Sequence, residues 1–163
     1  MLSRMAENMY WFARYLARAE NVARLVTVTT NLMLDLPRQV TADWGPLVDI
    51  TGSRGAVTAR HGEISEHRVV QFLLADRDNP GSLISSLTKA RENLRTTRDI
   101  VPSEAWEQIN RIHLMAQDKV GEALSRRGRH EFLQAIVGHC QQIVGLLGGA
   151  MSRDEAYVFM RLG

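Results

Sequence analysis

The sequence predicts an all-α protein, built as an antiparallel helical bundle of about five helices. Through most of the chain, apolar residues recur at alternating steps of three and four, which keeps them on one face of a helix. No segment alternates apolar and polar residues for as long as a half-buried strand requires. The connections between the amphipathic segments are short, and short connections place successive helices side by side and antiparallel.

The first predicted element is a long helix over residues 3–35. Its apolar face consists of Met5, Met9, Phe12, Leu16, Ala19, Ala23 and Val26. Pro37 ends this helix, because proline lacks a backbone N–H and restricts the residue before it. Residues 37–62 then hold two prolines and four glycines. This composition predicts an irregular connection that contains one short helix around residues 44–50.

Two further helices follow the irregular connection. Residues 65–75 carry a dense apolar set and predict the second long helix, which the segment 76–80 ends at its proline. Ser82 is a suitable N-cap for a third helix, since its hydroxyl can accept a hydrogen bond from an unpaired N–H of the first turn. The apolar spacing extends this third helix through Asp99.

The last two long helices lie in the C-terminal half. Residues 102–103 open a fourth helix whose apolar positions continue to Leu124, and residues 126–129 mark a basic turn. A fifth helix is predicted from about residue 130 to residue 147. The glycine pair at 148–149 is a stop signal, because glycine readily adopts the conformation that follows a helix C-terminus.

Residues 151–163 start another helix, and their layout is similar to that of residues 2–14. Both segments place Ser-Arg after an apolar residue and then enter a helix with aromatic residues. We interpret residues 1–163 as a single helical domain in which 151–163 begins a second repeat, so that the chain is half of a duplicated helical architecture. A helix separated from its repeat leaves apolar surface exposed, which predicts a homo-oligomer.

The composition favours a cytoplasmic protein. The chain has 163 residues, a net charge of +2 and one cysteine, Cys140, so no disulfide can form within it. This charge is too small to indicate nucleic-acid binding by itself, although eighteen of the 20 basic residues are arginine. The sequence has no signal peptide and no apolar run near the roughly 20 residues that a membrane span needs. We therefore expect no membrane association.

The first candidate binding surface is a stripe on the first helix. Seven residues fall on one side of it, nearly opposite the apolar face: Arg4, Glu7, Trp11, Arg14, Arg18, Asn21 and Leu25. One interpretation is a solvated face with weak ion pairs, each worth about 0.2–0.5 kcal/mol. The other is an interface, because a side that mixes Trp11 with Arg14 and Arg18 suits a partner or an anionic ligand. In that case Glu20 is a candidate for orienting the arginines.

The second candidate surface lies in the predicted third helix. Arg91, Arg95 and Arg98 fall on one side of it, next to its apolar face, and Glu92 and Asn93 lie between them. Arginines beside an apolar seam require carboxylate partners when they are buried. This segment is therefore either an ion-pair network between helices or an arginine-lined anion site.

No residue set predicts catalysis, a metal or a cofactor. Cys140 lies on the apolar face of its helix, which favours inert core over a nucleophile. The five histidines form no metal-binding spacing, and the helix end at residues 63–67 is a weak metal signal. The basic segment 126–130 could contact RNA or DNA, but it lacks interleaved aromatic residues, so a solvated loop is favoured.

The opening segment, Leu2-Ser-Arg-Met-Ala-Glu-Asn-Met-Tyr-Trp-Phe-Ala-Arg-Tyr-Leu-Ala-Arg-Ala-Glu-Asn21, resembles the start of the Alpha-E family, an all-helical domain named for a Glu-Arg motif. Shorter stretches continue the resemblance at 78–80, 90–93, 98–99, 103–107 and 152–155. The usual Leu-Glu-Arg-Ala-Glu of the family reads Leu16-Ala-Arg-Ala-Glu20 here, so Ala17 stands where the naming glutamate is expected. Members of the family are also usually longer than this chain.

The resemblance implies a bacterial peptide-ligation or protein-modification system. Alpha-E proteins tend to be encoded beside, or fused to, ATP-grasp-like ligases and transglutaminase-like proteins. A helical bundle without a catalytic set is then expected to be a non-catalytic accessory module that binds such a partner. Two alternatives stay open: an anion-binding helical enzyme domain that uses the clustered arginines, and a weak nucleic-acid-binding protein.

Overall fold

A computed structural model describes residues 2–163 and confirms the all-α fold class. Most of the described residues are helical, and no strand occurs among them. The elements in order are α1 (Leu2–Asp35), α2 (Gly45–Ile50), α3 (Arg54–His61), α4 (Glu66–Val70), the π-helical turn η1 (Gln71–Ala75), α5 (Leu83–Arg95), α6 (Ser103–Lys119), the 3-10 turn η2 (Val120–Leu124), α7 (Arg126–Ala150) and α8 (Glu155–Leu162).

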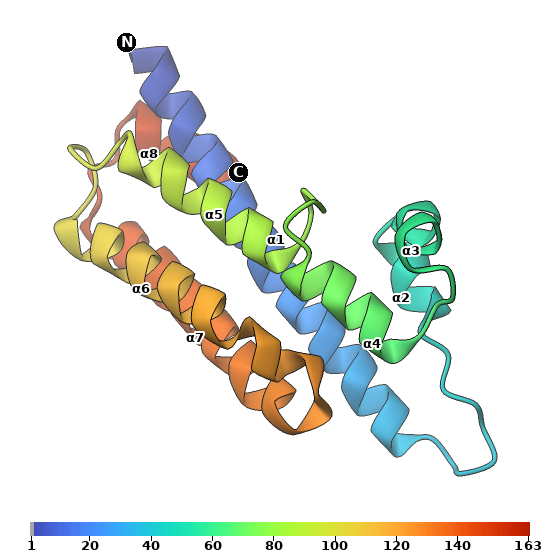
Figure 1. The fold of residues 1–163 in the computed structure, drawn as a ribbon. Coiled ribbons are helices and arrows are strands. Elements are labelled where there is room, and N and C mark those ends of the chain that lie inside the picture. The colour runs from blue at the N-terminus through green and yellow to red at the C-terminus, as the bar shows by residue number, and fades with distance from the viewer. Residues whose placement is uncertain (1) are drawn as a thin grey trace.

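Helix α1 is the longest element, and the other helices are arranged along it (Figure 1). It packs mainly against α5, α8 and α7, while α6 lies against α5 and α7. Helix α5 runs antiparallel to α1, since the Asn8 amide donates a hydrogen bond to Thr96 and the Lys89 ammonium lies over the Tyr15 ring. The short helix α2 contacts α1, and α3 packs against α2 and α4; in the view of Figure 1 both short helices lie on the side away from α6 and α7.

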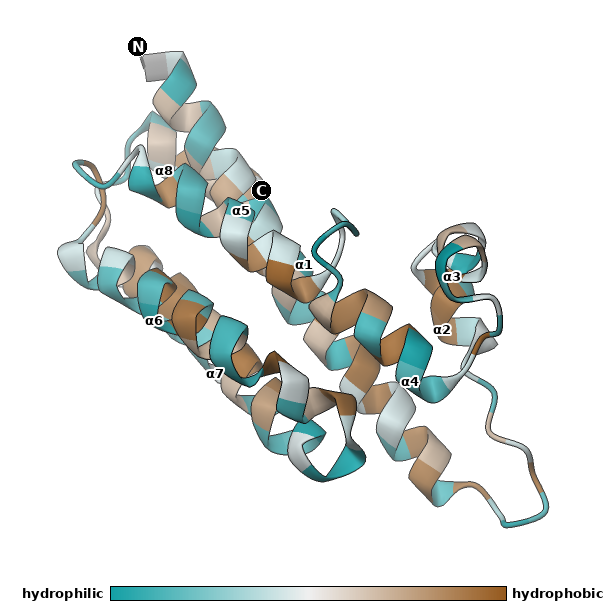
Figure 2. Ribbon diagram, in the orientation of Figure 1, coloured by the Kyte–Doolittle hydropathy of each residue, from teal (hydrophilic) through white to brown (hydrophobic). Residues whose placement is uncertain are grey.

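The core forms from the helix faces that the apolar spacing predicted. On α1, Met9, Phe12 and Leu16 are at most 2% exposed, whereas Met5 is only half-buried. Hydrophobic and hydrophilic stretches alternate along α5, α6 and α7, as expected of helices with one buried side (Figure 2). None of the described helices has the length and apolar character that a membrane crossing requires.

Two segments of the first half differ from the prediction. The connection at 37–62 contains a second short helix, α3, besides the expected one. The third long helix ends at Arg95 rather than at Asp99. The Thr96 and Thr97 hydroxyls donate hydrogen bonds to backbone carbonyls of the last turn. These bonds compete with continuation of the helix. The Ser82 cap is confirmed, because its hydroxyl accepts a hydrogen bond from the Ser85 N–H.

Helix α7 is longer at both ends than the sequence predicted. It begins at Arg126, so the basic segment 126–129 is the first turn of a helix and not a connecting turn. It continues through the glycines at 148–149 and ends at Ala150. At its start the arginine side chains bond to another helix, and near its end Arg153 donates a hydrogen bond to the Gly148 carbonyl. At the N-terminal end of α7, contacts with α4 thus override the local signal of a basic turn.

The predicted helix in residues 151–163 is present as α8. Asp154 caps it by accepting a hydrogen bond from the Tyr157 N–H, and the helix packs along α1. Val158, Phe159 and Leu162 remain exposed, and Phe159 and Leu162 line an open cavity between α8 and the start of α1. The duplicated architecture and the homo-oligomer stay predictions, and α8 is the surface on which they depend.

Candidate functional site

An open groove of about 750 Å³ lies beside α1, and we call it the α1 groove. One wall is formed by residues 14–25 of α1. Residues 50–56, which join α2 to α3, and the turn at 79–81 form the other side, whereas Gly163 lies against α1 next to Arg14. At its base are Phe72 and Leu73 of η1, both nearly fully buried. The groove therefore has a basic, polar wall above an apolar base.

The predicted stripe of α1 supplies the basic wall. Arg14 and Arg18 both line the α1 groove, as do Asn21 and Leu25. Neither arginine forms an ion pair within the described part of the chain, and no Asp or Glu side chain lines the groove there. The Arg18 guanidinium lies 5.6 Å from the Tyr15 ring centroid, where the ring face attracts a cation. The groove thus presents two arginines that pair with no acidic side chain of the described residues.

Trp11 continues the stripe one turn before Arg14. Its ring stacks on Tyr15 with a centroid distance of 5.7 Å, and the Tyr10 ring meets it edge-on at 5.2 Å. The Trp11 side chain is nevertheless 38% exposed. An aromatic side chain that is braced by its neighbours but open to solvent is well suited to bury further area against a partner.

Glu20 does not join these residues. Its carboxylate accepts two hydrogen bonds from Arg24 on the next turn, the shorter at 2.7 Å. It also lines a separate, smaller cavity of about 150 Å³ that α1 shares with α7 and α8. In the described residues, Glu20 therefore forms no hydrogen bond or ion pair with Arg14 or Arg18, the arginines that it is expected to orient.

The second arginine cluster is engaged in contacts between α5 and α6. Arg91 donates a hydrogen bond to Asn110 at 2.7 Å, pairs with Glu92 at 2.8 Å and lies over the Trp106 ring. Arg95 pairs with the same Glu92 at 3.0 Å. The contacts of Arg91 with Asn110 and Trp106 support the interpretation as a network between two helices, whereas the pair of Arg95 with Glu92 lies within α5.

The remaining residues of this cluster also lie outside the α1 groove. The Asn93 amide donates a hydrogen bond to the Lys89 carbonyl, and Arg98 is exposed. None of Arg91, Arg95 and Arg98 lines the groove. The structure therefore does not bring the two predicted arginine clusters onto one anion.

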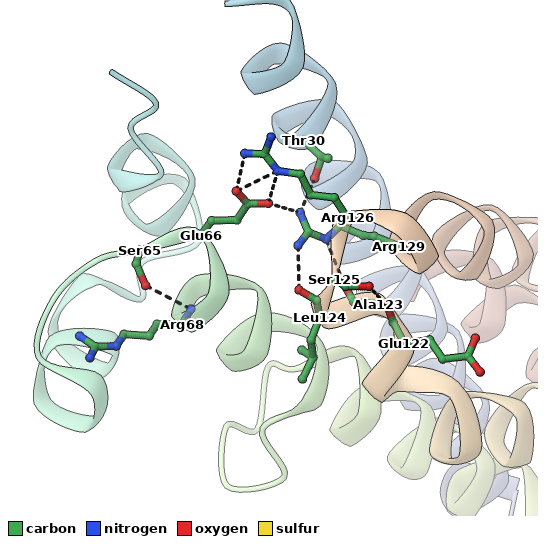
Figure 3. Close-up of polar contacts among 10 residues, drawn as sticks. All are labelled: Thr30, Ser65, Glu66, Arg68, Glu122, Ala123, Leu124, Ser125, Arg126 and Arg129. Atoms are coloured by element: carbon green, nitrogen blue, oxygen red, sulfur yellow. Dashed lines mark hydrogen bonds and ion pairs between the residues drawn. The ribbon is translucent and has the colours of Figure 1, made fainter. Parts of the chain in front are cut away.

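A third cluster, which the sequence did not indicate, joins four elements through Glu66 and two arginines (Figure 3). Arg129 is 1% exposed, and its guanidinium donates hydrogen bonds to the Ala123 and Leu124 carbonyls, to Thr30 and to Glu66. We call this set the Arg129 network. Glu66 lies more than 60 positions away from Arg129 in the sequence, so no local pattern pairs them.

The Arg129 network removes most of the basic surface that the nucleic-acid alternative relied on. Arg126 holds the Glu66 carboxylate through Nε and Nη2, the latter at 2.6 Å, and Arg129 is buried. Only Arg127 and His130 of this segment stay exposed without such partners in the described chain. Phosphate binding depends on several free basic side chains, so this surface is a poor nucleic-acid interface.

Glu66 should make the stability of the fold depend on pH. The hydrogen bond from Arg126, and then that from Arg129, hold the pKa of its carboxyl below the ordinary value, against the opposing effect of burial. Such a carboxyl contributes stability above its unfolded pKa, which is lost as the pH falls through the folded pKa. We expect urea unfolding to show that the stability difference between wild type and Glu66→Gln shrinks from about pH 7 to about pH 3. Glu63→Gln, at an exposed position, should show no such trend; a Glu66 difference independent of pH would contradict the assignment.

The groups that most often carry catalysis lie elsewhere in the core. Cys140 is fully buried, and burial raises the pKa of its thiol to about 12, which keeps it protonated at neutral pH. Burial, and then the positive charge of Arg91, lower the pKa of His113 at the α5–α6 contact. No set of three or more His, Cys, Asp or Glu side chains in residues 2–163 is placed to hold a metal ion.

Comparisons with known proteins agree with the resemblance seen in the sequence. The model of the Alpha-E family, described as a predicted alpha-helical domain with a conserved ER motif, matches residues 1–163. An uncharacterized protein of Mycobacterium bovis and two of Mycobacterium tuberculosis are each 22% identical over 182 residues, which covers 98% of this chain and 20% of theirs. The chain thus spans about a fifth of the length of these curated relatives. No solved structure matches the chain significantly.

Proposed function

The chain belongs to the Alpha-E family, and we propose that it is a non-catalytic helical module that binds a partner protein through Trp11, Arg14 and Arg18. We call these three residues the aromatic–arginine face. The resemblance to the family supports a role for such a module in a bacterial peptide-ligation or protein-modification system. The proposed partner is accordingly an ATP-grasp-like ligase or a transglutaminase-like protein.

One observation carries this proposal: Arg14 and Arg18 border a groove that no Asp or Glu side chain of the described residues lines. Arg91, Arg95 and Arg129, by contrast, pair with carboxylates of this chain. Exposed Trp and Arg side chains are also those that contribute most to binding energy at protein interfaces. Unpaired arginines beside an exposed Trp11 therefore support a role in recognition.

The alternative of an anion-binding enzyme domain has less support. It requires Arg91, Arg95 and Arg98 to converge with Arg14 and Arg18 on one ligand. Arg91 instead bonds to Asn110 of α6, and both Arg91 and Arg95 bond to Glu92 within α5.

Capture of the partner tests the proposal. The products of the genes that neighbour this one are immobilised, and binding of the wild type is compared with that of a Trp11→Ala/Arg18→Ala variant. We expect the double variant to bind at least about tenfold more weakly, because truncating one anchor residue at an interface commonly costs more than 1 kcal/mol.

The matched control is Leu114→Ala/Arg127→Ala. It also removes one large exposed apolar side chain and one exposed arginine, but from α6 and α7. Control binding should stay within about twofold of wild type, since substitutions away from an interface have small effects. Unchanged capture by the Trp11/Arg18 variant would reject the aromatic–arginine face.

A further inference from the structure

We propose that the α1 groove binds an extended acidic segment of the partner, with two carboxylates two residues apart and an apolar residue two positions further on. This inference rests on the proposed function and specifies what the groove recognises. It uses three features of the groove: its charge, the spacing of its basic residues and the position of its apolar residues.

The charge of the groove selects an anionic ligand. Arg14 and Arg18 line it, and no acidic side chain in the described chain does. A guanidinium binds a carboxylate through two parallel hydrogen bonds, which gives geometric selectivity as well as energy. The Arg18 guanidinium is already held over the Tyr15 ring, so less freedom is lost when it pairs with a ligand.

The spacing of the arginines selects an extended peptide. Positions 14 and 18 are four residues apart on a helix, which separates them by about 6 Å along the axis. In an extended chain, side chains two residues apart point to the same side and lie about 6.7 Å apart. Two carboxylates in an acidic–any–acidic arrangement therefore match Arg14 and Arg18 in register.

The same register continues onto apolar surface. Val22 lies four positions after Arg18 and lines the groove, with Leu25 beside it. A third side chain of the extended segment, two residues after the second carboxylate, reaches this position. Phe72 and Leu73 at the base of the groove offer further apolar contact. An apolar side chain there leaves water, whereas a charged one would be desolvated without a partner.

The backbone of the ligand also finds polar groups in the groove. The Asn21 amide, between the arginine and apolar positions, has no hydrogen-bond partner elsewhere in residues 2–163 and can bond to a peptide group. On the facing side, Gly52 lines the groove with an exposed backbone and no side chain, and its positive φ of 65° is a conformation that favours glycine. A nucleic acid fits this site less well, because the wall offers two cations and then becomes apolar.

A peptide set tests the inference directly. The parent peptide is fluorescein-labelled Ser-Glu-Ser-Glu-Ser-Leu-Ser, in which the two Glu residues are two positions apart. In the variant peptides this separation is one, three or four positions. Fluorescence anisotropy measures binding to the wild type. We expect the tightest binding at a separation of two, by about fivefold over the other spacings, and about tenfold weaker binding when both Glu residues are replaced by Gln.

The protein variants separate recognition from net charge. Arg14→Gln/Arg18→Gln should weaken binding of the best peptide about tenfold. Arg111→Gln/Arg127→Gln removes the same charge from exposed positions outside the groove and should change binding less than twofold. The circular dichroism spectrum of each variant is compared with that of the wild type, to check that its helices are retained.

Several outcomes would overturn the inference: equal affinity at all spacings, equal weakening by both double variants, or displacement of the peptide by a single-stranded oligonucleotide at equal concentration. Partner capture that depends on Trp11 and Arg18, without binding of any peptide in the set, would reject the acidic segment but leave the proposed function standing. If partner capture did not depend on Trp11 and Arg18, and no peptide in the set bound, both the proposed function and the acidic segment would be rejected.

Discussion

Replacing Arg129 with methionine is expected to destabilise the fold by about 3–5 kcal/mol, the usual cost of breaking a buried ion pair by removing one partner. The methionine would fill much of the same space, but the Ala123 and Leu124 carbonyls and Thr30 would lose their donor. Glu66 would keep only Arg126, which lies at the surface. Urea unfolding followed by circular dichroism measures the change as a shift of the midpoint.

The neighbouring Arg127→Met is the matched control for this prediction. Arg127 is exposed on the same helical turn, so its replacement should change the free energy of unfolding by less than about 0.5 kcal/mol. A double-mutant cycle of Arg129→Met with Glu66→Gln should also show coupling, because the two side chains contact each other at 2.8 Å. Equal effects of Arg127→Met and Arg129→Met would show that the network contributes nothing to stability.

Replacing Gly128 with alanine is expected to destabilise the fold by about 1–2 kcal/mol, within the range observed for overpacking. A Cβ at this position would lie 2.7 Å from the Glu122 carbonyl oxygen and 3.1 Å from the carbonyl carbon. These are backbone atoms of η2, whose next carbonyl, that of Ala123, accepts a hydrogen bond from Arg129. The clash can therefore be relieved only by moving η2 away from the Arg129 network.

The same substitution at Gly145, further along α7, should have the opposite sign. Nothing lies within 4 Å of a Cβ there, and the position is exposed. Alanine is favoured over glycine in a helix interior by up to about 1 kcal/mol, so Gly145→Ala should raise the melting temperature while Gly128→Ala lowers it. If both variants were stabilised, η2 would not pack against α7 as described.

The local pattern of the sequence predicted the helices well where one face is apolar and the caps are clear. The apolar spacing from Met9 to Val26 correctly predicted the buried side of α1, and Ser82 correctly predicted the start of α5. It predicted the boundaries poorly where contacts between distant residues decide them. Helix α7 begins early because its first arginines bond to Glu66, and nothing in the sequence around Arg126 reports that contact.

The candidate site shows the same division. The helical wheel alone places Trp11, Arg14 and Arg18 on one side of α1, opposite the core. It does not tell which arginines are already paired. The structure shows that Arg91 bonds to α6 and that Arg95 pairs with Glu92 within α5, whereas Arg14 and Arg18 border an open groove.

By itself, the sequence determined the all-α class, the amphipathic face of each long helix and the membership in the Alpha-E family. These depend on residue spacing within about one or two helical turns, which the chain order fixes directly. Only the tertiary structure decided which charges are neutralised. An ion pair such as Glu66–Arg129 depends on where two helices meet, and the stripe of α1 became one wall of a groove only when α2, α3 and the turn at 79–81 packed beside it.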